Sequence, residues 1–262
     1  MPRVLLLCLL LGGCAPAEPP PRRLVVSAPR AFAPLLAAWE QADPAARADV
    51  ETTISPRAVA DVREGLADLA LVGRDLRPDE TGVVAHVLGR DAVAVIVHKD
   101  NPIPNLTTNQ AAGLFARVHT DWKELGGTER PISTVGLGEG RAVRDAFLDY
   151  LGVKPPQTRP DPAVANSEQA VAAVASRPGA VGYVALASAR AAMATAPVRV
   201  VPLDGVAPSP DTVLTGKYPL VRPVVLVSRP TPRPAVQAFL DFARSARGRA
   251  ILAAQGYVPG GP

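Results

Sequence analysis

The stretch LVVSAPRAFAPLLAAWE, residues 24–40, sets the pattern from which the fold can be inferred. Its first five residues are mostly apolar and include two valines, which predicts a buried strand. A short loop follows, and Phe32, Leu35, Leu36 and Trp39 then recur at the spacing of one helix face. A strand, a loop and an amphipathic helix form one unit of a layered α/β fold.

The same unit recurs toward the middle of the chain. VETTIS (residues 50–55) predicts a second strand, a helix follows at residues 58–66, and ADLALVG (67–73) predicts a third strand. DAVAVIVHK (91–99) predicts another strand, which the proline-containing segment NPIPNL ends. Thr107 and Gln110, which come next, have the spacing of a capping box and predict a helix start.

The second half continues the alternation. Strands are predicted at ISTV (132–135), VGYVAL (181–186) and YPLVRPVVLVS (218–228), and helices from Arg141, at SEQAVAAVA (167–175) and at 234–255. The segment PVRVVPL (197–203) leads back from the second lobe. Alternating strands and helices predict two α/β lobes with largely parallel sheets, and 262 residues are enough for each lobe to bury a core.

Composition excludes several classes of function. The 28 Lys and Arg residues outnumber the 24 Asp and Glu residues by only four, and the basic residues are scattered, which argues against a nucleic-acid surface. The isolated His86, His98 and His119 lack the spacing of metal ligands, so no metal or cofactor is predicted.

The N-terminus has the pattern of a secretory leader. Residues 1–3 carry a positive charge and residues 4–11 are apolar but too few to span a bilayer. LGGC, ending at Cys14, resembles a bacterial lipobox and predicts a signal peptide over 1–13 and a lipid anchor on Cys14. The Pro-rich residues 14–23 would form an extended tether. A plain signal peptide with an incidental cysteine is the alternative.

The stretch NPIPNLTTNQAAGLFARVHTDWKELGG, residues 101–127, carries the most specific family resemblance. Together with DAVAVIVHKDNP, PGAVGYVAL, GKYPLVRPVVLV and the closing GYVP, it resembles the phosphate-binding proteins of ABC importers over nearly all of residues 24–259. The resemblance implies the type II periplasmic-binding fold, in which a ligand sits in a cleft between two lobes. We expect residues 24–100 and 200–262 to form one lobe and 101–199 the other.

The resemblance also implies a function and a location. We expect a monomeric solute-binding lipoprotein, anchored in the periplasm or cell envelope, that delivers phosphate or a related oxyanion to a membrane permease. An alternative is an envelope sensor or scaffold that kept the fold and lost phosphate binding. The fold alone does not specify the ligand.

Three loops supply phosphate ligands in this family, and here they depart from its pattern. The usual Ser-Gly-Ser-Thr-Thr is Ser27-Ala-Pro-Arg-Ala, which keeps only the first hydroxyl. The second loop has lost both serines but ends in Gly73-Arg74. Some relatives place an Asp in this loop to accept a proton from the ligand, and Gly73 cannot do so. The third loop, residues 137–147, keeps Arg144 but has lost its Ser and Thr, and Arg141 appears.

Hydroxyl groups have thus been exchanged for arginines, whose planar forks suit phosphate or carboxylate. The predicted ligand-binding residues are Ser27, Arg30, Ser55, Arg57, Gly73, Arg74, Arg141 and Arg144. The alternative is that these arginines pair with nearby acids, for which the candidates are Asp75, Glu64, Glu139 and Asp145.

Enzyme motifs are missing. Gly136, Gly138 and Gly140 follow a predicted strand, but Arg141 stands where a dinucleotide fingerprint needs its third glycine. The sequence also lacks a Walker loop, Gly-x-Ser-x-Gly and His-Glu-x-x-His. We therefore expect a binding protein and not an enzyme.

Overall fold

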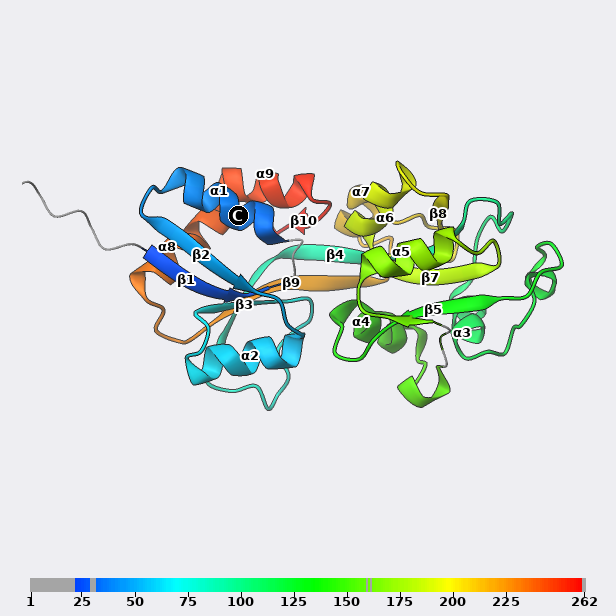
Figure 1. Cartoon of the computed structure of the whole chain (residues 1–262), viewed down its shortest axis with the longest axis horizontal. Helices are drawn as coiled ribbons and strands as arrows, with labels where there is room; N and C mark the ends of the chain where they lie inside the picture. Colours follow the sequence, from blue (N-terminus) through cyan, green and yellow to red (C-terminus); the bar gives the residue numbers. More distant parts are fainter. Residues whose placement is uncertain (1–21, 29–31, 159, 161, 261–262) are drawn as a thin grey trace, which may run out of the picture.

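The computed structural model describes residues 22–28, 32–158, 160 and 162–260 (Figure 1). The strands are β1 Arg22–Ser27, β2 Ala46–Glu51, β3 Leu69–Val72, β4 Val84–His98, β5 Ser133–Leu137, β6 Ala163–Val164, β7 Ala180–Ala185, β8 Val198–Val201, β9 Val221–Ser228 and β10 Val258–Pro259. The α-helices are α1 Ala33–Ala42, α2 Ser55–Glu64, α3 Thr108–Phe115, α4 Ala142–Leu151, α5 Ser167–Ala175, α6 Leu186–Met193, α7 Pro210–Leu214, α8 Pro234–Arg244 and α9 Ala246–Ala254. Two 3-10 turns, η2 Trp122–Leu125 and η3 Pro155–Gln157, complete the elements.

The strands follow the order β2-β1-β3-β9-β4-β7-β5-β6, and β8 and β10 also pair with β4. Pairing is parallel within β2-β1-β3 and within β7-β5-β6, whereas β4 and β9 pair antiparallel with their neighbours. The predicted largely parallel sheets are therefore mixed. In Figure 1 the long β4 and β9 run from one half of the molecule into the other, with helices on both faces of each half.

β4 takes part in two cores because its two ends pair with different strands. Its first half pairs with β9 and β10, and Val93–His98 pairs with β7 and β8. The largest core joins the second half of β4 to β5, β7 and α3–α6, and the other two cores join β1, β3 and β9 to α1, α8, α9 and α2.

The lobe boundaries stay a prediction. Leu203, Val213, Tyr218 and Leu220 pack in the largest core with residues from β4 onward, and Tyr218 donates a hydrogen bond from its hydroxyl to the carbonyl of Val93 at 2.7 Å. The segment between β8 and β9 therefore contributes to the same core as α3–α6.

Two elements differ from their predictions. The strand predicted at VETTIS lies earlier, at Ala46–Glu51, and Ser55 already begins α2. β2 is an edge strand with mostly exposed side chains, so its sequence carries no apolar alternation to reveal it. The helix predicted over 234–255 is two helices, because Ser245 ends α8 and caps α9 by accepting from the Gly248 N–H at 3.1 Å.

The capping box at the start of α3 is confirmed. The Thr107 hydroxyl accepts from the Gln110 N–H at 3.1 Å, and the Gln110 side chain accepts from the Thr107 N–H at 2.9 Å. Within the described part of the chain, no helix is long and apolar enough to cross a membrane. The predicted leader, Cys14 and nearly all of the tether lie outside the described residues.

Candidate functional site

The candidate site begins at the carboxyl ends of three parallel strands. Ser27, the last residue of β1, is paired in register with Glu51 of β2 and Ala70 of β3. The segments that follow β2 and β3 lead to Ser55 at the start of α2 and to Gly73. Crevices outside the carboxyl ends of strands are the usual ligand sites of open α/β sheets.

The start of α4, which follows β5, approaches these strand ends. A Cβ atom placed on Gly140 would lie 2.9 Å from Cδ1 of Ile54, the residue that precedes α2. A Cβ atom placed on Gly73 would lie 3.1 Å from the Cβ of Ala142, the first residue of α4. The second and third predicted loops, and the Ser55 loop, are therefore brought together.

Neither of the two helices that meet here has a side-chain cap. Ile54 is the N-cap of α2 and Arg141 is the N-cap of α4, and neither side chain accepts a hydrogen bond from its helix. The first N–H groups of both helices are left without an intrahelical partner, except at Pro56 of α2, which has no N–H, and each N-terminus carries a partial positive charge. Such helix starts are suited to an anion.

Two of the predicted arginines are engaged in ion pairs. Arg57 Nε lies 2.7 Å from Asp61 Oδ1, and its side chain is 61% exposed. The Arg74 guanidinium donates to both carboxylate oxygens of Glu80, at 2.5 and 2.7 Å, with 14% of its side chain exposed. The bond to Arg74 lowers the pKa of Glu80, and the bond to Glu80 raises the pKa of Arg74. Both arginines are therefore paired with acids, but their partners, Asp61 and Glu80, were not among the candidates from the sequence.

The remaining predicted residues have different surroundings. Ser27 is buried, and its hydroxyl has no hydrogen-bond partner among the described residues. Arg141 and Arg144 are half-buried, and neither side chain makes an ion pair with any residue that the structure describes. Arg30 lies outside the described residues. Ligand contact by these residues stays a prediction.

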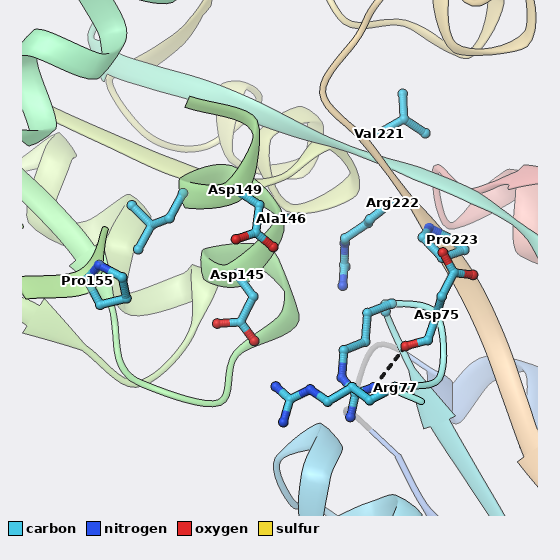
Figure 2. Close-up of a pocket in the computed structure, with 12 residues that line it drawn as sticks. Asp75, Arg77, Asp145, Ala146, Asp149, Pro155, Val221, Arg222 and Pro223 are labelled. Atoms are coloured by element: carbon cyan, nitrogen blue, oxygen red, sulfur yellow. Dashed lines mark hydrogen bonds between the residues drawn. The ribbon is translucent and has the colours of Figure 1, made fainter. Parts of the chain in front are cut away.

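A cavity of about 500 Å³ opens beside Gly73 and Arg74, between α4, the segment after β3, and β9 (Figure 2). Its wall consists of Gly73, Arg74, Asp75, Arg77, Asp145, Ala146, Leu148, Asp149, Pro155, Val221, Arg222 and Pro223. Figure 2 shows Asp145 and Asp149 on one side, facing Arg77 and Arg222 on the other. Its lining therefore carries both signs of charge.

Arg222 is a residue of this cavity that the sequence analysis missed. It is the cross-strand partner of Asp91, and its Nε and Nη2 donate to Asp91 Oδ2 at 3.1 and 2.6 Å. The Asp91 side chain is fully buried, and burial raises its pKa although the charge of Arg222 opposes this. Asp91 is the one acidic residue of β4 and Arg222 the one charged residue of β9, and this was the available signal, because buried charges need partners.

The described residues hold no group of three or more His, Cys, Asp or Glu side chains placed to bind a metal ion.

Burial raises the pKa of Asp145 above its ordinary value, and the nearby Asp149 adds to this effect, whereas the charges of Arg144 and Arg77 oppose it.

Comparison with known proteins places this chain and its fold in a family. A family model described as a PBP superfamily domain matches residues 15–247. The phosphate-binding protein PstS of Bacillus subtilis is 27% identical over 249 residues, which cover 90% of this chain and 80% of that protein. The PstS 2 protein of Streptococcus pneumoniae is 31% identical over 129 residues, which cover 46% of this chain and 43% of the relative.

Solved structures of phosphate transport proteins have a similar fold. A putative phosphate ABC transporter substrate-binding protein from Clostridium perfringens, with bound phosphate, superposes with a TM-score of 0.81 at 25% identity, covering 91% of this chain and all of that one. An ABC-type phosphate transport receptor from Vibrio cholerae has the same fold, with a TM-score of 0.75 at 22% identity, covering 90% of this chain and 99% of that one.

The molecule is a two-lobed α/β binding protein of the type II periplasmic-binding fold. The chain belongs to the PBP superfamily, and its resemblance to the phosphate-binding proteins of ABC importers is confirmed. Membership of this family supports a substrate-binding role outside the cytoplasm. The family consists of binding proteins for transport and not of enzymes.

Proposed function

We propose that this chain is an extracytoplasmic solute-binding lipoprotein that captures phosphate or a related oxyanion between its lobes and delivers it to an ABC permease. The observation that carries the proposal is the approach of the uncapped starts of α2 and α4, where Ile54 lies against Gly140 and Ala142 lies against Gly73. Two positive helix ends provide backbone N–H donors that do not depend on the lost hydroxyl side chains. Relatives named as phosphate-binding proteins support the choice of anion.

Arg141 and Ser27 would complete this site. Arg141 stands at the start of α4, and its guanidinium has no acidic partner among the described residues. The Ser27 hydroxyl is buried and has no partner among the residues that the structure describes, which is costly unless a ligand or water satisfies it. We propose that Cys14 carries the lipid anchor and that the protein acts as a monomer.

Titration calorimetry of the purified full chain with phosphate and sulfate tests the proposal. We expect saturable binding of phosphate, and Arg141→Ala should weaken it by about 10- to 100-fold, since a charge-assisted hydrogen bond contributes about 1.5–3 kcal/mol. Arg190→Ala is the control, because Arg190 is an exposed arginine on α6 in the same chain. Absence of saturable binding to either anion would contradict the proposal.

One observation favours the alternative of an envelope sensor or scaffold without a ligand. Arg74, the arginine that the second loop retains, is held by Glu80 in a two-point ion pair. If the protein has lost its ligand, calorimetry with either anion will give no heat of binding. The purified chain will then bind a partner protein other than a permease.

A further inference from the structure

The cavity beside Gly73 is larger than an inorganic oxyanion requires. Its volume is about 500 Å³, whereas phosphate has only five non-hydrogen atoms. Cavities of about 300–1,000 Å³ commonly hold organic ligands. The free room points to a ligand with a substituent beyond its anionic group.

Arg222 provides a fixed cation in this cavity. Asp91 accepts from its Nε and Nη2, which leaves both Nη1 hydrogens without an acceptor among the described residues. Nη1 lies against Gly73, only 1.9 Å from where a Cβ would stand. The cross-strand pair therefore holds the guanidinium still, with free donors at the cavity wall.

Asp145 and Asp149 provide the opposite chemistry on the facing wall. They lie one turn apart on α4, and both line the cavity (Figure 2). No ion pair joins either carboxylate to any described residue, although Arg77 and Arg222 face them across the cavity. Like charges four residues apart destabilise a helix, and a bound cation between them would remove that cost.

We infer that the ligand is zwitterionic: a phosphate ester or phosphonate whose anionic group lies at Arg222 and the start of α4, and whose ammonium group lies between Asp145 and Asp149. This inference rests on the proposed oxyanion site and specifies what is attached to the anion. The two walls impose opposite requirements, because arginine only donates hydrogen bonds and an ionised carboxylate only accepts them. A ligand with an anion alone would leave the α4 wall unmatched.

Three probes separate this inference from the proposed function. Titration calorimetry at pH 7 of the full chain compares inorganic phosphate, ethyl phosphate and 2-aminoethyl phosphate, which is ethyl phosphate with an added ammonium group. We expect 2-aminoethyl phosphate to bind about tenfold or more tightly than ethyl phosphate, because its ammonium group is charged at this pH and meets two carboxylates.

The near-isosteric variants Asp145→Asn and Asp149→Asn should bring the two esters to equal affinity while ethyl phosphate binding stays within twofold or strengthens. Asp211→Asn, an exposed aspartate on α7, is the matched control and should leave the preference unchanged. If the unmodified protein binds both esters with equal affinity and still binds phosphate, this inference is overturned but the proposed function is not. Failure of all three probes to bind would instead overturn the proposed oxyanion site.

Discussion

The guanidinium of Arg222 fills the space that a side chain at Gly73 would occupy. A Cβ on Gly73 would lie 1.9 Å from Arg222 Nη1 and 2.9 Å from its Cζ. Arg222 cannot easily withdraw, because it is bonded to the buried Asp91 on the neighbouring strand. Glycine at position 73 and arginine at position 222 are therefore structurally coupled.

This coupling predicts that Gly73→Ala is harmful to both stability and binding. The added methyl group must displace a fixed guanidinium, and overpacking of this kind costs about 1–3 kcal/mol in the free energy of unfolding. Urea denaturation measures the loss, and phosphate calorimetry measures weaker binding. Gly138→Ala is the control, since its nearest neighbour would be the Val164 carbonyl at 3.8 Å. Equal stability of the two variants would contradict the coupling.

The Asp91–Arg222 pair predicts strong non-additivity. Asp91→Ala leaves a largely buried guanidinium unpaired and should cost about 3–5 kcal/mol in the free energy of unfolding. In the double variant Asp91→Ala, Arg222→Leu, an apolar side chain replaces the unpaired charge, so the loss should be smaller than in Asp91→Ala alone. A double-mutant cycle by urea denaturation tests this. Additive losses would show that the two side chains act independently.

Sequence patterns predicted most of the fold because buried strands and amphipathic helices carry periodic apolar residues. The helix SEQAVAAVA matches α5, Ser167–Ala175, and the capping box at Thr107 is confirmed. The edge strand β2 escaped because its exposed residues are not periodic. The break at Ser245 also escaped, because the apolar spacing continues across it and only the cap reveals two helices.

The site was less predictable because it depends on contacts between distant parts of the chain. The loops at Ser55, Gly73 and Arg141 do come together. Whether Arg74 is free or paired depends on where the exposed loop places Glu80, six residues away. Arg222 comes to the cavity through the register between β4 and β9, which no local pattern fixes.

The Arg74–Glu80 pair predicts a dependence of stability on pH. The pKa of Glu80 is lowered from its ordinary value of 4.5 because Arg74 and the Arg77 N–H bond its charged form. The stabilisation is therefore complete above about pH 4.5 and is lost as the pH falls through the lower pKa of the folded protein.

Glu80→Gln should remove this contribution, so the variant is less stable than the unmodified protein at pH 7 and the difference shrinks between pH 5 and pH 3. Thermal unfolding followed by circular dichroism across this range measures the effect. Glu139→Gln replaces an exposed glutamate without an ion-pair partner among the described residues and should leave the pH profile unchanged. A constant difference across the range would mean that the glutamate does not stabilise through its charge.

The capping box of α3 predicts a loss that depends on the hydroxyl group alone. Thr107→Ala removes the acceptor for the Gln110 N–H and should cost about 1 kcal/mol in the free energy of unfolding. Thr107→Ser keeps the hydroxyl and should stay within a few tenths of a kcal/mol of the unmodified protein. Urea denaturation compares the three proteins. Equal losses for Ala and Ser would assign the effect to the threonine methyl group instead, because that group is absent from both variants.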